Sequence, residues 1–332
     1  MTDHRGLWEH ARFTAPRLED GYCTDDNARA LIVMSRQADP SPDLVELAGI
    51  YLTFLRDAHL PDGGFHNRRN SDGSWADEMG SDDSQGRALW ALGSAAGRGS
   101  EPWMREVALD LFDQQRDFRS TSPRANAFAV LGASEVLVAA PNHRAARHIL
   151  RRCVGHILVR DDALWPWPED RLAYDNARLP EALLAAGALL PNHGLIEAGL
   201  HLLEWLAAKE GPDGHFSFTP AGGWGPGEPR PGFDQQPVEA AAMADACSRA
   251  WSLTGDGRWK DRVRRAAQWF LGVNDTGAML YDPRTGGCDD GLGPDYTNLN
   301  QGAESTLAAL ATLQQAEAVE RTEAGRRARS VA

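Results

Sequence analysis

Apolar residues recur at helical spacing along most of the chain, and they rarely alternate as they do in strands. Leu44, Leu47, Tyr51 and Leu55, for example, fall on one helical face. Similar patterns, bounded by capping residues, prolines and glycines, predict eleven helices. Thr24 or Asp25 is expected to cap the first. The expected ranges are 24–37, 43–58, 83–96, 102–116, 122–140 and 143–158, helices that begin near 179, 193, 237 and 258, and 303–319.

Short breaks and long polar loops separate these predicted helices. A short break makes consecutive helices antiparallel, so the helices form hairpins. Five or six such hairpins close into a ring, which predicts an all-α fold, an (α/α)6-type toroid of antiparallel helical hairpins with the long loops on one face. The helices that follow the long loops, such as 88–93 and 239–242, are rich in Ala and Gly, which suits a crowded inner ring. We expect one domain over residues 1–320 and a frayed basic tail over 321–332.

Two pairs of similar segments lie the same distance apart in the sequence. Residues 61–65 (PDGGF) resemble 212–216 (PDGHF), and residues 83–85 (DSQ) resemble 234–236 (DQQ), both at an offset of 151 residues. Equal offsets at two places favour duplicated hairpins over chance. In a toroid, all inner helices begin at the same end, so the acidic segments at their starts are expected to meet at one mouth.

Two of these acidic segments carry adjacent aspartates, Asp25-Asp26 and Asp82-Asp83. A single Asp before a helix is usually an N-cap, but a cap needs only one carboxylate. Hydrolysis of a glycosidic bond requires two carboxyl groups, one as acid and one as base or nucleophile. Neighbouring acids also raise one another's pKa, which suits a general acid. The predicted catalytic residues are therefore Asp25, Asp26, Asp82 and Asp83, with one member drawn from each segment.

Arginine, amide and aromatic side chains accompany the acids. Each arginine either pairs with a neighbouring carboxylate or contacts a carboxylate or phosphate of the substrate. Amides suit sugar hydroxyls, and loop tryptophans either anchor their loops or stack on sugar faces. The predicted substrate-binding residues are Arg29, His66, Asn67, Trp75, Arg87, Trp165, Trp167, Tyr174, Asp175, Phe233, Asp234, Gln235, Gln236, Glu239, Tyr296, Asn298, Asn300 and Glu304.

Composition narrows the range of partners. The chain has 332 residues and a net charge of -13, with acids spread over its length, which argues against nucleic acid as a partner. The most apolar run, 182–190, is too short to span a bilayer, so no membrane partner is expected. The four cysteines lie far apart and show no zinc-binding spacing. We expect no metal, no cofactor and a reduced, cytoplasmic protein.

Several motifs resemble those of poorly characterised bacterial proteins that are labelled glycosyltransferase or glycosidase-like. Residues 21–32 (GYCTDDNARALI) carry this resemblance most clearly, and 80–90, 233–240 and 298–307 resemble the later motifs. The pattern is also similar to six-hairpin (α/α) toroid glycosidases, a superfamily that includes polysaccharide lyases, phosphorylases and sugar epimerases. The resemblance implies a carbohydrate substrate and raises association with a glycosyltransferase as a hypothesis.

We therefore predict a glycoside hydrolase that acts with paired carboxylates on an oligo- or polysaccharide. Two alternatives stay open. One is a phosphorylase, lyase or sugar epimerase with the same fold, since fold alone does not choose a reaction. The other is a non-catalytic glycan-binding accessory domain of a glycosyltransferase system. The sugar, the linkage, the stereochemistry and the oligomeric state are left open at this level.

Overall fold

The computed structural model describes residues 1–331, and their side chains as far as Glu323. Within this range the chain forms eleven helices, which confirms the predicted all-α class. The helices are α1 (Thr24–Ser35), α2 (Pro42–Ala58), α3 (Asp82–Arg98), α4 (Pro102–Gln114), α5 (Pro123–Ala139), α6 (Arg144–Val154), α7 (Arg178–Leu189), α8 (His193–Glu210), α9 (Pro237–Thr254), α10 (Gly257–Phe270) and α11 (Ala303–Val331).

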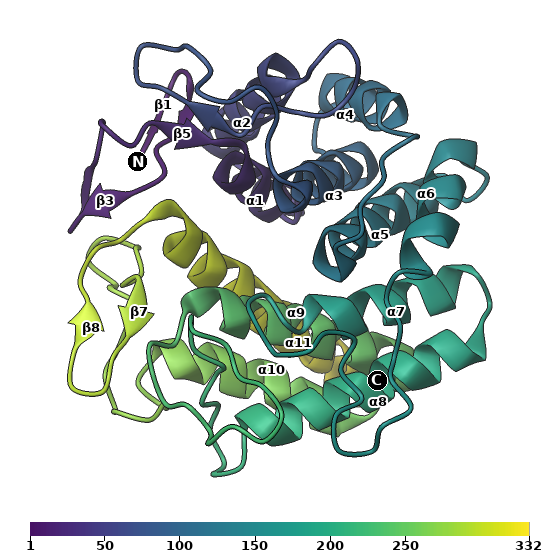
Figure 1. Cartoon of the computed structure of the whole chain (residues 1–332), viewed down its shortest axis with the longest axis vertical. Helices are drawn as coiled ribbons and strands as arrows, with labels where there is room; N and C mark the ends of the chain where they lie inside the picture. Colours follow the sequence, from purple (N-terminus) through teal and green to yellow (C-terminus); the bar gives the residue numbers. More distant parts are fainter. Residues whose placement is uncertain (332) are drawn as a thin grey trace.

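The helices form two concentric rings (Figure 1). The odd-numbered helices α1, α3, α5, α7, α9 and α11 contact one another in chain order, and α11 returns to contact α1. The even-numbered helices pack outside them, each against the helix that precedes it. The predicted (α/α)6-type toroid is therefore confirmed, with its inner ring closed by the contact of α11 with α1. Because the hairpins are antiparallel, all inner helices begin at the same end.

The inner helices approach one another closely where their residues are small, as the sequence predicts. At the crossing of α3 and α5, a Cβ atom built on Gly93 would lie only 2.1 Å from the carbonyl oxygen of Gly132. A Cβ on Gly132 would in turn lie 2.3 Å from the carbonyl oxygen of Leu89. Any larger side chain at these positions would force the two backbones apart.

Two of the predicted helix ends differ in the structure. The side chain of Cys23 caps α1 by accepting a hydrogen bond from the Asp26 amide, so neither Thr24 nor Asp25 is the cap. Helix α11 continues to Val331, beyond its predicted end near residue 319. Residue 332 lies outside the described part of the chain.

Short antiparallel strand pairs lie near the starts of α1 and α11 (Figure 1). The N-terminal residues form two of them, and β5, just before α1, pairs with β6 in the loop after α2. The strands are β1 (Thr2–Asp3), β2 (Gly6–Leu7), β3 (Ala11–Arg12), β4 (Ala15–Pro16), β5 (Tyr22–Cys23), β6 (Arg68–Arg69), β7 (Gly291–Leu292) and β8 (Thr297–Asn298).

None of the described helices combines the length and the apolar character that a membrane crossing requires. All four cysteines are buried and carry free thiols.

Candidate functional site

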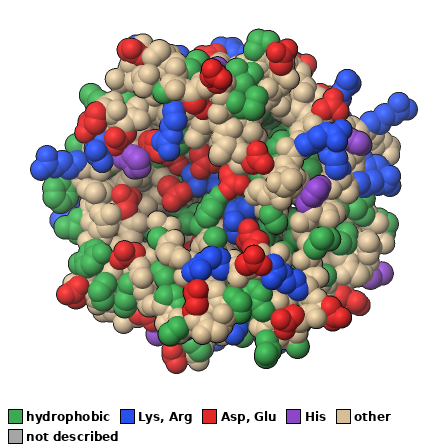
Figure 2. Space-filling view, in the orientation of Figure 1, with side chains coloured by type: hydrophobic (Ala, Val, Ile, Leu, Met, Phe, Trp, Pro, Cys, Tyr) green, Lys and Arg blue, Asp and Glu red, His purple; other side chains and the backbone are tan. Residues whose placement is uncertain are grey.

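A cleft of about 700 Å³ opens where the inner helices begin. In the space-filling view this face is hollowed near its centre, where acidic and basic side chains gather (Figure 2). All four predicted catalytic aspartates line the cleft. So do seven residues of the predicted binding set, namely Arg29, Asn67, Arg87, Tyr174, Gln236, Asn298 and Glu304.

The first turns of α1 and α3 place the aspartates at the cleft. Ser81 caps α3 with its hydroxyl, which accepts a hydrogen bond from the Ser84 amide, as Cys23 caps α1. The four aspartates therefore lie one to three residues after the caps of their helices and are released from capping. The positive end of each helix dipole favours carboxylates there. Their release from capping leaves them available for other contacts.

Two arginines join the acidic helix starts. The guanidinium of Arg29 contacts Asp26 (Nη1–Oδ1, 2.8 Å) and Glu304 (Nη2–Oε2, 2.6 Å). It also pairs with Asp25, which Arg87 contacts from α3 (Nε–Oδ1, 2.7 Å). The arginines thus hold carboxylates of α1 and α11 in fixed positions, which is the first of the two roles predicted for them.

The polar floor beneath the cleft includes three residues that were predicted to bind substrate. Asp175 and Gln235 are fully buried, and Glu239 is nearly so. Glu239 accepts hydrogen bonds from the amides of Asp175 and Asn176. Gln235 accepts hydrogen bonds from the Phe218 amide (3.0 Å) and from the indole of a buried tryptophan. The side chains of these three residues are held by contacts within the protein and do not line the cleft.

The pKa values of the cleft carboxyls are shifted in opposite directions. Asp25 is partly desolvated, but Arg29 and Arg87 outweigh this and lower its pKa. Burial raises the pKa of Asp26, and Asp25 and Glu9 add to the rise against the opposing charge of Arg29.

The carboxyl of Asp83 has a raised pKa because burial outweighs the charges of Arg124 and Arg87. It accepts a hydrogen bond from Ser122 Oγ (3.2 Å) and forms no ion pair with any described residue. Glu304 also has a raised pKa. Arg29 acts on it most strongly and lowers the pKa, but burial and the charges of Asp26 and Asp25 together outweigh that effect. Carboxyls with contrasting pKa values side by side are a common property of acid–base sites.

The predicted tryptophan platforms are packed into the protein instead of lining the cleft. Trp167 is fully buried and stacks on Trp205, and Trp165 meets the edge of the same ring. Trp75 lies between His66, on which it stacks, and Arg69, whose guanidinium lies over its ring. Trp75, Trp165 and Trp167 therefore pack against other side chains of the protein and do not line the cleft.

The remaining predicted binding residues lie outside the cleft lining. The exposed Asp234 accepts a hydrogen bond from the hydroxyl of Tyr296 (2.9 Å). Asn300 accepts one from the Phe13 amide, and Phe233 packs against the core. The ring of His66 contacts the Asp77 carbonyl oxygen as well as Trp75. The structure does not bring these side chains into the cleft.

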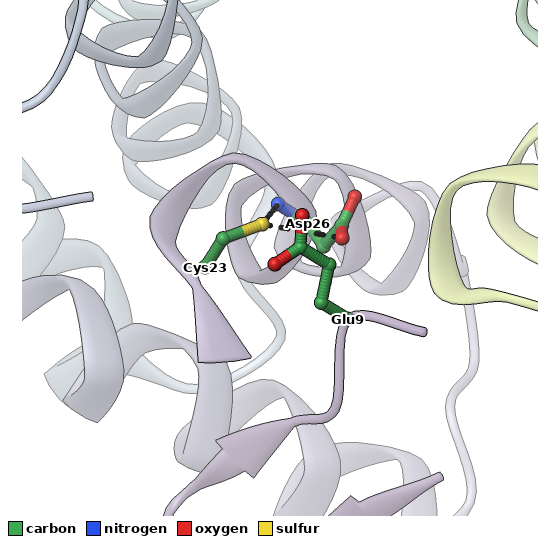
Figure 3. Close-up of side chains that lie close together, drawn as sticks. All are labelled: Glu9, Cys23 and Asp26. Atoms are coloured by element: carbon green, nitrogen blue, oxygen red, sulfur yellow. Dashed lines mark hydrogen bonds between the residues drawn. The ribbon is translucent and has the colours of Figure 1, made fainter. Parts of the chain in front are cut away.

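The sequence-based prediction missed several cleft residues. Some come from the N-terminal segment and from loops, and others are small side chains at the starts of α1, α3 and α11. These residues are Glu9, His10, Cys23, Arg68, Ser81, Ser84, Asp290 and Ser305. Among the described residues, Glu9, Cys23 and Asp26 form the group that could hold a metal, with ligand atoms within 4.8 Å of one another (Figure 3). The Cys23 thiol instead donates a hydrogen bond to Asp26 Oδ2 (3.2 Å), and Glu9 pairs with Arg68.

No protein-family model and no curated protein sequence matches the chain. Several solved structures share its fold. A sugar epimerase from a ruminal bacterium matches with a TM-score of 0.73 and 14% identity, over 97% of this chain and 93% of that one. Cellobiose 2-epimerase from Bacillus thermoamylovorans matches with a TM-score of 0.71 and 12% identity, over 96% and 94%.

A GH76 alpha-mannanase from Bacteroides thetaiotaomicron matches with a TM-score of 0.64 and 13% identity, over 91% of this chain and 87% of that one. At identities this low, the similarities establish the toroid fold that the helix contacts define. The chemistry of the cleft has to be argued from its own residues.

Proposed function

We propose that the protein is a carbohydrate-active enzyme that hydrolyses glycosidic bonds in the cleft where the inner helices begin. The observation that carries this proposal is the pair of cleft carboxyls, Asp83 on α3 and Glu304 on α11, whose pKa values are raised in different surroundings. Asp83 has no cationic partner among the described residues and is the proposed proton donor to the leaving oxygen. Glu304, held by Arg29, is the proposed base.

The charge balance of the cleft indicates which glycans it accepts. Seven carboxylates line it against three arginines. All three arginines are already paired within the protein, Arg29 and Arg87 as described above and Arg68 with Glu9. A substrate carboxylate or inorganic phosphate would therefore meet excess negative charge without a free cation. This favours a neutral or amine-bearing glycan and argues against uronic-acid polymers and against phosphorolysis.

The test is digestion of a glycan library, followed by kinetics of point variants on the glycan that is cleaved. We expect Asp83→Asn and Glu304→Gln each to lower kcat by about 10²–10⁴-fold, the usual contribution of acid–base groups. Asp43→Asn, an exposed aspartate in the first turn of α2, is the control and should keep full activity. Asp26→Asn and Asp82→Asn test the other predicted catalytic residues in the same assay.

Full activity of both Asp83→Asn and Glu304→Gln in folded protein would refute the proposed pair. Tight binding of oligosaccharides without any turnover would instead favour the accessory-domain hypothesis. Calorimetric titration with the library glycans distinguishes the two results, because it detects binding whether or not a bond is cleaved.

The second candidate is epimerisation of a sugar, since two of the proteins that share this fold are named as sugar epimerases. Such a reaction moves a proton on and off carbon and leaves the glycosidic bond intact. It therefore incorporates deuterium from D2O into the sugar, which proton NMR detects, and it releases no new reducing ends. Exchange without new reducing ends would replace hydrolysis by epimerisation as the function.

A further inference from the structure

Three cavities follow one another along the axis of the toroid. The cleft shares Arg29, Arg87 and Glu304 with a second cavity of about 40 Å³. The second shares Arg36 and Asp245 with a third, of about 260 Å³. Residue numbers rise along the inner helices from the first cavity to the third, as from Arg29 in α1 to Arg36, the residue that follows α1. The third cavity therefore lies at the opposite mouth of the ring.

The second cavity is wide enough for water and too small for a sugar. Its walls combine apolar side chains, such as Ile32 and Leu307, with the charged groups that it shares with its neighbours. A cavity needs roughly 10–15 Å³ to hold one water molecule, whereas small-molecule sites usually have about 300 Å³ or more. The second cavity is therefore of a size that admits water and excludes a sugar.

Unpartnered polar atoms mark the same route. Arg29 Nε, Arg36 Nη1 and Gln314 Oε1 are buried and have no hydrogen-bond partner among the described residues. Arg29 lines the first two cavities, Arg36 the last two, and Gln314 the third. Buried polar groups are nearly always hydrogen-bonded to protein or to ordered water. A row of ordered water molecules along the three cavities would supply hydrogen-bond partners for these two donors and one acceptor.

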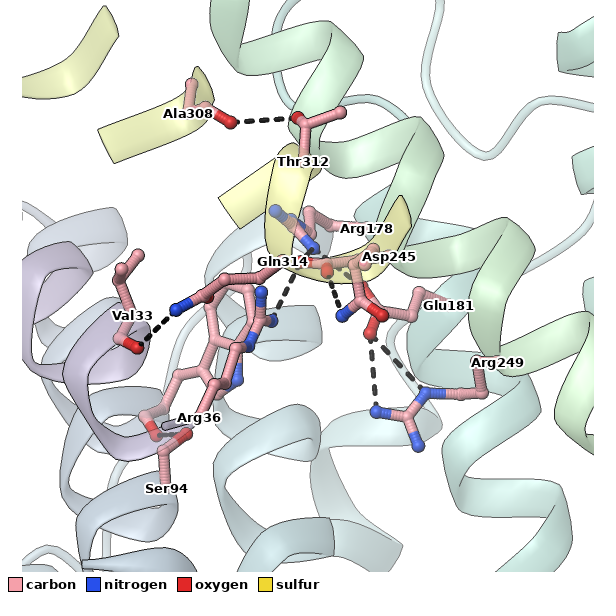
Figure 4. A network of polar contacts seen from close by, with 12 residues as sticks. Val33, Arg36, Ser94, Arg178, Glu181, Asp245, Arg249, Ala308, Thr312 and Gln314 are labelled. Carbon is pink, nitrogen blue, oxygen red and sulfur yellow. Dashed lines mark hydrogen bonds and ion pairs between the residues drawn. The ribbon is translucent and has the colours of Figure 1, made fainter. Parts of the chain in front are cut away.

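Ion pairs fix the side chains that lie between the second and the third cavity (Figure 4). Asp245 contacts Arg36 (Oδ2–Nη2, 2.8 Å) and Arg178 (Oδ2–Nη1, 2.6 Å). Gln314 donates its amide to the Val33 carbonyl oxygen (3.0 Å), which leaves its own oxygen to face other partners. Charged contacts therefore join the residue after α1 to α7 and α9 at this point.

We propose that the axis of the toroid is a water passage that delivers the hydrolytic water from the opposite mouth to the floor of the cleft. This rests on the proposed hydrolysis. A glycan that fills the cleft would block the entry of water through the mouth of the cleft. Glu304 and Arg29 line both the cleft and the second cavity, so water from the opposite mouth would reach them. Water that arrives there gives its proton to the Glu304 carboxylate as its oxygen bonds to the anomeric carbon. The glycosidic C–O bond breaks, and Asp83 protonates the leaving oxygen.

The first test blocks the passage without touching the acid–base pair. Ala311 and Ala241 line the second cavity, and both point small side chains at it. We expect Ala311→Leu to lower kcat about tenfold or more while the dissociation constant for the glycan, measured in an inactive Asp83→Asn background, stays unchanged. Ala241→Val should act in the same direction and serves if Ala311→Leu does not fold. Ala316→Leu, on α11 but outside the three cavities, is the matched control.

Wild-type kcat in folded Ala311→Leu and Ala241→Val would overturn the water passage and leave the proposed hydrolysis standing. A high-resolution crystal structure of the wild-type protein is the second test and needs no substrate. It should show ordered water at Arg29 Nε, Arg36 Nη1 and Gln314 Oε1, and Ala311→Leu should lose the water between the two arginines. A dry second cavity in the wild type would also overturn the inference. Ordered water without hydrolysis of any glycan would instead contradict the proposed function.

Discussion

Arg87 and Asp175 form a buried ion pair beneath the cleft, with 2.9 Å between Nη1 and Oδ2. The same guanidinium contacts Asp25 through Nε and lies 4.0 Å from the ring centroid of Phe128. Arg87 therefore connects α1, α3, α5 and the segment that precedes α7. Both it and Asp175 are almost completely removed from solvent. Without Arg87, Asp175 would keep Arg178 as its remaining ion-pair partner. Asp25 would likewise keep Arg29 as its remaining ion-pair partner.

We expect Arg87→Ala to lower the free energy of unfolding by about 3–5 kcal/mol, because it leaves buried carboxylates incompletely compensated. Urea denaturation followed by circular dichroism measures this. Arg284→Ala is the control, since the Arg284 side chain is 87% exposed and pairs with Asp282 at the surface. Its effect should stay within about 0.5 kcal/mol. A similar small loss for Arg87→Ala would show that the network contributes little to stability.

The pH dependence of stability should report on Glu210, a buried residue at the end of α8. Burial raises its pKa to about 7, although Oε1 accepts a hydrogen bond from the Thr219 amide. The unfolded value is about 4.3. Between these values the folded state holds a proton that the unfolded state has released, so stability falls as pH rises through this window.

Glu210→Gln should reduce this loss, to which Glu210 contributes roughly 2.5 kcal/mol between pH 5 and pH 8 in the wild type, and the buried Glu239 beside it contributes in the same direction. Denaturation midpoints measured from pH 5 to pH 8 test it. Glu197→Gln changes an exposed glutamate on the same helix and should keep the wild-type slope. An unchanged slope in Glu210→Gln would show that another group releases the proton.

Ser122 should tune the proposed acid. Its hydroxyl donates to Asp83 and lowers the pKa of that carboxyl against the larger effect of burial. Ser122→Ala should therefore raise the Asp83 pKa further and shift the basic limb of the kcat profile upward by about half a pH unit. Ser120→Ala removes the equivalent hydrogen bond to Asp82 and should leave that limb in place. A downward shift, or equal shifts in both variants, would exclude Asp83 as the proton donor.

The crossing of α3 and α5 should tolerate no added methyl group. Gly93→Ala places a Cβ against the Gly132 carbonyl oxygen and should destabilise the protein by about 1–3 kcal/mol, the usual cost of overpacking. Gly257→Ala, where no atom lies within 4 Å, should instead be neutral or stabilise α10 by up to about 1 kcal/mol. Thermal unfolding of both variants separates the two effects. Equal melting temperatures would mean that α3 and α5 move apart easily.

The ring could be predicted from the sequence because its causes are local. Apolar spacing, prolines at helix starts and small residues on alternate helices all act within a few turns, and the structure confirms the helices and their inner and outer arrangement. The predicted mouth also follows from this alternation. Four aspartates that begin α1 and α3 do meet there.

The rest of the site depends on contacts between distant segments. Glu9 and Arg68 reach the cleft through the hairpins before α1 and the pairing of β5 with β6, which no short-range pattern indicates. The loop tryptophans looked available because their loops are polar, yet Trp167 finds Trp205 on a helix that begins 26 residues later in the chain. Cys23 replaces the expected cap because β5 already fixes the backbone before α1.

The cluster of Glu9, Cys23 and Asp26 should hold no tightly bound metal. Burial, with Asp26 and Glu9 nearby, raises the pKa of the Cys23 thiol, whereas metal ligation requires a thiolate. The carboxylates are paired with Arg68 and Arg29. We expect metal analysis of the purified protein to find well under one equivalent, and EDTA to leave its melting temperature unchanged. Cys23→Ser should keep α1 capped and remain folded, because serine is a preferred N-cap. One equivalent of zinc that is lost in Cys23→Ser would contradict this prediction.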